Sequence, residues 1–103
     1  MIDLLKTDVA AWNTWRDENP DAKIDLFGAH LYRAGLKGAN LRYTDLRDAD
    51  LYHADLQNAN LSYADLEGAD LSDANLEGAN LDKANLYGVD VSGAYLGDEG
   101  SCA

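Results

Sequence analysis

Apolar residues recur at every fifth position through most of this chain. From residue 24 to residue 98 the sequence divides into fifteen five-residue units without an insertion. Leucine fills the third place in fourteen of the units, and alanine fills the first place in twelve. Asp or Asn holds the second place in twelve. A short period sustained over so many units is typical of a repeat architecture.

The five-residue spacing excludes a helix for this region. On an α-helix a step of five residues turns about 500°, so Leu26, Leu31 and Leu36 would spiral around every face. On one straight strand the odd step would place successive leucines on opposite faces. The leucines and alanines all face one axis only if the chain bends once in every unit. The pattern therefore predicts a β-solenoid of stacked coils.

The fifth place of the unit carries residues that suit a corner. Glycine occupies it six times and Asp or Asn four times. These residues tolerate the positive φ that the third residue of a type II turn requires. We expect the larger residues at this place to force a different turn type; they are Arg33, Tyr43, His53, Tyr63 and Lys83.

The repeat resembles that of the pentapeptide repeat family, whose signature is A(D/N)LXX. The resemblance covers residues 24–98 and departs from the signature mainly at His30, Gly35 and Thr44 and in the last two units. It implies four units per coil. The expected fold is therefore all-β, a right-handed quadrilateral β-helix (β-solenoid) of about four coils with a short N-terminal capping helix.

We divide the chain into an N-terminal helical cap (1–23), the pentapeptide-repeat β-helix (24–98) and a C-terminal tail (99–103). The cap helix is expected to follow Thr7 or Asp8 and to stop at Asn19-Pro20.

Two tryptophans lie at helical spacing within the cap. Trp12 and Trp15 are placed to cover the first coil, and a ligand box is the alternative interpretation. The surrounding WNxWRxxNP stretch resembles segments found ahead of pentapeptide repeats, which favours the capping role.

The net charge of the chain limits the kinds of partner that we expect it to bind. Nineteen acidic and eight basic side chains give a formal charge of −11, which argues against direct nucleic-acid binding through phosphates. No apolar run is long enough to span a membrane, and the start of the sequence lacks the features of a signal peptide. We expect a cytoplasmic protein without a membrane partner.

The sequence offers no chemistry that we can assign to an enzyme. Asp and Asn interchange at the second place, and an amide cannot replace a general base, although either side chain accepts a backbone N–H bond. One cysteine and two histidines, His30 and His53, fall short of a zinc pattern. We therefore predict no catalytic residue, no metal and no cofactor.

With four units per coil, residues twenty apart stack on one face. Tyr32 over Tyr52 and Tyr43 over Tyr63 should then form stacks on the outside. Two candidate partner surfaces follow, and their residues are Tyr32, Arg33, Tyr52 and His53 on one face and Arg42, Tyr43 and Tyr63 on another.

The acidic residues gather toward the C-terminus. Residues 24–63 have a net charge of −1, and residues 64–103 have a net charge of −8. A candidate acidic surface consists of Glu67, Asp73, Glu77, Asp82 and Asp98.

We predict a non-catalytic structural or protein-interaction module, a rigid acidic solenoid that presents flat faces to an unidentified macromolecular partner. The alternative is a DNA-mimicking inhibitor or protector of a type II topoisomerase such as DNA gyrase. The resemblance brings this alternative in, since some family members are acidic rods that occupy the DNA site of such enzymes.

The C-terminal end of the repeat is expected to expose apolar side chains, because the tail is short and rich in glycine. This suggests an end-to-end homodimer through the last coil. The candidate rim consists of Val89, Val91, Tyr95 and Leu96.

Overall fold

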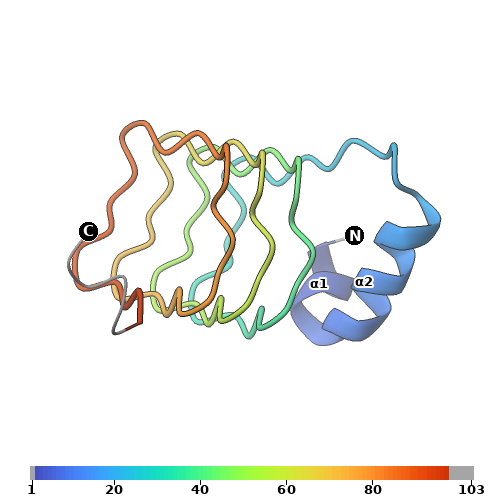
Figure 1. Cartoon of the computed structure of the whole chain (residues 1–103), viewed down its shortest axis with the longest axis horizontal. Helices are drawn as coiled ribbons and strands as arrows, with labels where there is room; N and C mark the ends of the chain where they lie inside the picture. The colour runs from blue at the N-terminus through green and yellow to red at the C-terminus, as the bar shows by residue number, and fades with distance from the viewer. Residues whose placement is uncertain (1, 98–103) are drawn as a thin grey trace.

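A computed structural model describes residues 2–97 of the chain. Two helices, α1 (Ile2–Thr7) and α2 (Val9–Glu18), lie at one end of a stack of coils, and the described chain finishes at the other end (Figure 1). The molecule measures 37 × 24 × 23 Å along its principal axes. Asp98 and the predicted tail 99–103, with its Cys102, lie outside the described residues.

Helix α2 lies where the sequence predicted a helix, with a cap at each end. The Asp8 carboxylate accepts a hydrogen bond from the Ala11 N–H at 3.0 Å, which satisfies a first-turn donor. Asn19 ends the helix, and Pro20 follows directly. Helix α1, in contrast, was not predicted from the sequence. It buries Leu5 completely in the same core as the repeat leucines.

The coils are held together by parallel bridges between residues twenty apart. These bridges run from Asp25 with Asp45 to Asn75 with Tyr95, and each joins residues at the second place of their units. Four units therefore complete one turn of the chain. This is the spacing that the family resemblance implied.

The structure contains isolated bridges where the sequence predicted an all-β fold. Residues 2–97 form no continuous strand, and only the second place of each unit is bridged. The reason is geometric: a corner in every unit leaves a straight piece too short for a regular ladder. The stack is a β-helix in its hydrogen bonding, with very low strand content.

A repeating set of three backbone hydrogen bonds joins adjacent coils. The Leu26 N–H donates to the Asp45 carbonyl at 2.8 Å, and the Asp45 N–H donates to the Ile24 carbonyl at 2.9 Å. The Gly28 N–H donates to the Arg47 carbonyl at 2.8 Å. Each coil thus supplies donors and acceptors that only a neighbouring coil can match.

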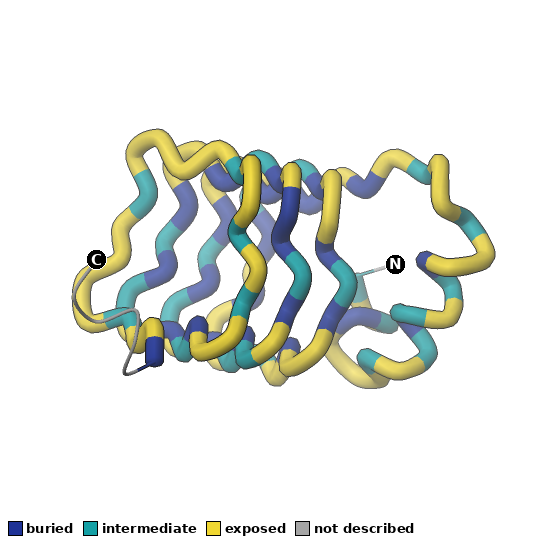
Figure 2. The backbone as a smooth tube through the Cα atoms, viewed as in Figure 1, coloured by how far each residue is buried: buried dark blue, intermediate teal, exposed yellow. Residues whose placement is uncertain are grey.

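The first and third places of the units face the interior, as predicted. Every third-place leucine from Leu26 to Leu76 is buried, and the alanines two residues earlier line the same axis (Figure 2). Burial weakens toward the C-terminus, where Leu86, Val91 and Leu96 are 44%, 52% and 39% exposed. The outermost coil therefore leaves its apolar side partly open.

The expectation of a different turn type at large fifth-place residues is wrong. The φ values of Arg33, Tyr43, His53, Tyr63 and Lys83 lie between 58° and 62°, and those of the six glycines at this place lie between 64° and 73°. The stack imposes one corner geometry, because each corner N–H must reach the next coil. Hydrogen bonds between coils offset the strain of the left-handed backbone.

The second-place Asp and Asn residues have the structural role that their interchange indicated. Their Oδ1 atoms accept from the N–H two residues later, as in Asp50 to Tyr52 at 3.1 Å and Asn60 to Ser62 at 3.0 Å. Carboxylate and amide serve equally well here, because only an acceptor oxygen is used.

Candidate interaction surfaces

One face of the stack carries a ladder of exposed aromatic rings. Tyr43 and Tyr63 belong to successive coils, and their rings stack with centroids 4.7 Å apart and planes 7° apart. The two residues are 58% and 46% exposed. The Arg42 guanidinium lies 5.1 Å from the Tyr43 centroid, within the range of a cation–π contact. The structure thus brings together all three residues of this predicted surface.

The neighbouring face is organised differently from the prediction. The Tyr52 ring packs edge-on against His53 at 4.8 Å, and the ring contacts of residues 2–97 include no stack of Tyr32 on Tyr52. His53 Nε2 in turn lies 4.0 Å from a carboxylate oxygen of Asp73 in the next coil. Tyr32 and Arg33 are exposed. These side chains share a face without forming a continuous aromatic surface.

The acidic residues are exposed, but cations interrupt them. Glu67, Glu77 and Asp82 are exposed, and Asp73 lies beside His53. Arg47 donates to the Asp45 carboxylate from Nε at 2.9 Å and from Nη2 at 2.8 Å.

These hydrogen bonds lower the pKa of Asp45 below its usual range and raise the pKa of Arg47. Similarly, the backbone N–H of Ser92 lowers the pKa of Asp90. Arg47 thus neutralises the Asp45 carboxylate, and its Nε lies 3.9 Å from a carboxylate oxygen of Asp65 in the next coil.

Helix α2 completes the edge of the first coil at one unit, residues 39–43. Asn13 Oδ1 accepts from the Asn40 N–H at 2.8 Å, and Trp12 Nε1 donates to the Asn40 carbonyl at 2.8 Å. Arg16 Nη2 donates to the Arg42 carbonyl. These are the three backbone groups that a preceding coil would satisfy elsewhere in the stack. Three side chains of α2 therefore make the hydrogen bonds that a preceding unit makes elsewhere in the stack.

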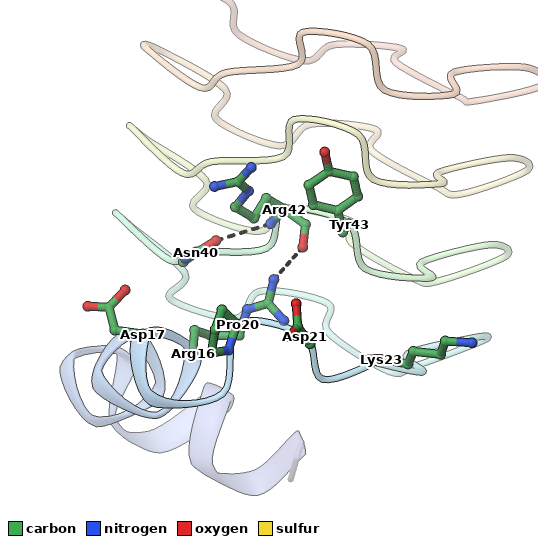
Figure 3. Close-up of a pocket in the computed structure, with 8 residues that line it drawn as sticks. All are labelled: Arg16, Asp17, Pro20, Asp21, Lys23, Asn40, Arg42 and Tyr43. Atoms are coloured by element: carbon green, nitrogen blue, oxygen red, sulfur yellow. Dashed lines mark hydrogen bonds between the residues drawn. The ribbon is translucent and has the colours of Figure 1, made fainter.

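A pocket of about 680 Å³ opens beside this junction (Figure 3). The chain between α2 and the first coil forms one wall, and the unit 39–43 forms the other. Its lining residues are Arg16, Asp17, Pro20, Asp21, Lys23, Asn40, Arg42 and Tyr43.

Comparison with known proteins identifies the repeat. The family described as "Pentapeptide repeats (8 copies)" matches residues 29–62 and 59–98, which is more than half of the chain. The protein belongs to the pentapeptide repeat family. Among curated proteins no significant match was found.

Several solved structures of pentapeptide repeat proteins are similar to this one. A protein from the cyanobacterium Cyanothece 51142 is 38% identical, with a TM-score of 0.50, over 71% of this chain and 54% of its own. HetL, from the cyanobacterium Nostoc sp. strain PCC 7120, is involved in heterocyst differentiation regulation. It is 43% identical, with a TM-score of 0.38, over 72% of this chain and 41% of its own. This pentapeptide repeat protein therefore spans roughly half the length of these relatives.

QnrB1, a plasmid-mediated fluoroquinolone resistance protein, is 27% identical, with a TM-score of 0.30, over 68% of this chain and 42% of its own. Membership of the pentapeptide repeat family implies a right-handed β-helix for residues 24–97, in agreement with the bridges between residues twenty apart.

The functional residues that sequence reasoning missed lie in the cap of this pentapeptide repeat protein. Trp12 was predicted to cover the first coil, but the hydrogen bonds that Trp12, Asn13 and Arg16 make to the unit 39–43 were not predicted. The W-N-x-x-R pattern places the three side chains close together on a helix, which is the feature that points to a shared target. No sequence feature marked the pocket, because its two walls come from segments about twenty residues apart.

Residues 2–97 contain no group of three or more His, Cys, Asp or Glu side chains placed to hold a metal ion. Neither α1 nor α2 is long and apolar enough to cross a membrane.

Proposed function

We propose that this pentapeptide repeat protein is a non-catalytic protein-interaction module whose main partner surface is the face of Arg42, Tyr43 and Tyr63. The observation that carries the proposal is the exposed stack of Tyr43 on Tyr63 beside Arg42. Tyrosine and arginine dominate the energetics of protein interfaces. A backbone bonded to neighbouring coils loses little entropy when a partner docks on it. Members of this family are generally non-enzymatic repeat proteins.

In our proposal the architecture that presents this face has two parts, a helical cap and a stack of coils. Helices α1 and α2 cap the first coil, residues 24–98 form just under four coils of four units, and the capped stack acts as one rigid body. The burial of Leu5 and Trp12 together with the repeat leucines supports the capping role. So do the hydrogen bonds from Trp12, Asn13 and Arg16 to the unit 39–43.

Affinity capture from lysate of the source cells tests the proposed face. The wild type is compared with a Tyr43→Ala/Tyr63→Ala variant and with a matched Tyr32→Ala/Tyr52→Ala control from the neighbouring face. We expect a specific protein band that the first variant loses and the control keeps. Equal capture by all three proteins, or equal loss from both variants at unchanged melting temperature, would contradict the assignment of the face.

The C-terminal rim is proposed as a second surface, for an end-to-end homodimer. Val91 and Leu96 are more than a third exposed, and Val89 packs partly against the core. A two-fold axis would bring these side chains of two copies together. Sedimentation at micromolar concentration should give a dimer that Val91→Glu converts to a monomer. A monomer in the wild type would remove this proposal and leave the tyrosine face untouched.

Inhibition or protection of a type II topoisomerase such as DNA gyrase by DNA mimicry is the alternative function. The exposed carboxylates of Glu67, Glu77 and Asp82 support it. Arg47 weighs against it, because it places a positive charge next to the acidic columns. A supercoiling assay with gyrase decides the matter: neither inhibition nor protection at a tenfold molar excess would remove this alternative.

A further inference from the structure

The pocket between helix α2 and the first coil gathers positive charge in a strongly acidic protein. Three of the chain's eight basic side chains line it, Arg16, Lys23 and Arg42, together with two aspartates. We propose that this pocket binds an oxyanion, a carboxylate or phosphate group carried by a small molecule. The proposal does not depend on the tyrosine face binding a protein.

The first argument is the state of Arg16, which is 5% exposed. Its Nη2 donates to the Arg42 carbonyl, while Nε and Nη1 are fully buried and have no hydrogen-bond partner within residues 2–97. A guanidinium offers five N–H donors, and burying them unpaired is unfavourable. Burial and then the nearby Arg42 lower the pKa of Arg16. An anion in the pocket would relieve both effects.

The second argument is that the other two cations of the pocket make no ion pair with a described residue, although the Arg42 guanidinium lies over the Tyr43 ring. No ion pair between described residues involves Lys23 or Arg42, although Asp17 and Asp21 line the same pocket. The Asn40 side-chain amide accepts through Oδ1 from the Arg42 N–H, and its Nδ2 makes no hydrogen bond to residues 2–97. Arg47, in contrast, is held by Asp45 at 2.8 Å. Arg16, Lys23 and Arg42 therefore line one pocket without an ion pair among the described residues.

The third argument concerns size and access. A volume of about 680 Å³ suits a small organic anion and exceeds what a single ion fills. Figure 3 shows the Arg16 guanidinium pointing from α2 toward the Arg42 carbonyl, with Pro20 and Asp21 from the connecting chain beside it. The backbone of residues 20–23 makes one hydrogen bond, from the Ala22 N–H to the Asn19 carbonyl. Because Nε and Nη1 are buried in the structure, the proposed binding requires this wall to move and expose them to the ligand.

Nuclear magnetic resonance of the ¹⁵N-labelled full chain tests the proposal, with the arginine Nε–H signals as the readout. Arg16→Met assigns the Arg16 signal by removing it. Inorganic phosphate and acetate are titrated separately at constant ionic strength, with sodium chloride as the reference salt. We expect the Arg16 signal to shift and saturate with one of the two anions, while the Arg47 signal stays in place. The anion with the higher affinity identifies the group as phosphate or carboxylate.

Variants that leave Arg16 intact guard against a loss of folding. Lys23→Gln should weaken the binding about three- to tenfold, since one unit charge in a partly exposed pocket contributes on the order of 1 kcal/mol. Lys37→Gln makes the same charge change on another face and should leave the affinity unchanged. Equal affinity of the Lys23→Gln and Lys37→Gln variants for the anion would contradict the proposed site.

Two further outcomes would overturn the proposal. The Arg16 signal could shift without saturating, and sodium chloride could cause the same shift. This result would mean an adventitious ion only. The Arg16 signal of the wild type could stay in place with both anions and yet shift in the Asp21→Asn variant. This result would mean that the Asp21 carboxylate already binds the Arg16 guanidinium.

Discussion

The two ends of the solenoid are built from the same five-residue unit and differ in what covers them. At the N-terminal end, Leu26 is 3% exposed although no coil precedes it. At the other end Leu86, three coils further along the same face, is 44% exposed. The repeat sequence alone therefore does not decide whether its leucine is buried. A coil buries its interior only when another element lies against it.

The difference extends to the backbone. The unit 39–43 at the N-terminal edge has its Asn40 and Arg42 groups satisfied by Trp12, Asn13 and Arg16. Among residues 79–96 the third-place N–H groups have no coil above them within the described chain. A helix thus protects an end in two ways, through apolar cover and through side chains that imitate the backbone of a coil.

Replacing the two leucines of one face should give the largest difference between the ends. Leu26→Ala removes a buried side chain and should lower the free energy of unfolding by about 2–5 kcal/mol. Leu86→Ala removes one that is nearly half exposed and should cost about 1 kcal/mol. Urea denaturation of both variants measures the two values. Equal losses would show that the last coil is covered in solution, for example by a second copy of the chain.

Corner glycines provide a second contrast, within a single column. A Cβ added at Gly78 would lie 2.2 Å from Asn58 Oδ1, whereas one at Gly38 in the first coil meets nothing within 4 Å. Both glycines have nearly the same φ, +73° and +72°. Gly38→Ala should therefore cost only the left-handed backbone strain, about 1–2 kcal/mol. Gly78→Ala should cost about 1–2 kcal/mol more, because the Asn58 side chain must move.

A double variant separates the two contributions to the cost at Gly78. In an Asn58→Ala background the contact is gone, so Gly78→Ala should cost no more than Gly38→Ala. An unchanged cost in that background would show that the strain lies in the backbone and that the Asn58 contact is harmless.

Trp12 tests whether the helix really replaces a unit. Trp12→Phe keeps most of the apolar cover and removes the Nε1–H that reaches the Asn40 carbonyl at 2.8 Å. It should cost about 1–2 kcal/mol, because the carbonyl is left without its donor. Trp15→Phe, a partly buried neighbour in the same helix, should cost less than half of this. Hydrogen exchange of the amides of residues 39–43 should quicken in the Trp12 variant only.

Much of the fold could be predicted from the sequence because each position of the repeat has one structural role. The leucine period predicted the interior, and the exchange of Asp for Asn predicted the local hydrogen bonds. The shape of the corners could not be derived from propensity: Tyr43 and His53 have a positive φ because the stack requires it. Local preference predicted the opposite, and contacts between coils outweighed it.

The interaction surfaces were less predictable than the fold. The spacing of twenty placed Tyr43 beneath Tyr63 correctly, since position in a column depends on the backbone alone. It failed for Tyr52, whose ring turns toward His53 within its own unit. The pocket and the unpaired nitrogens of Arg16 depend on how α2 docks, which the repeat pattern does not specify.

Gly35 gives the smallest and most local test of the comparison between ends. It lies in the first coil, at the second place of its unit, where most other units have Asp or Asn. Its backbone does not have a positive φ. A Cβ there meets nothing within 4 Å, so Gly35→Ala should stabilise the protein by about 0.4–1 kcal/mol through the unfolded chain. Gly35→Asn should add about 0.5–1 kcal/mol, because its Oδ1 can accept from the Lys37 N–H as in other units. Thermal unfolding of the two variants isolates the hydrogen bond as their difference. An Asn variant no more stable than the Ala variant would mean that this bond contributes nothing in the first coil.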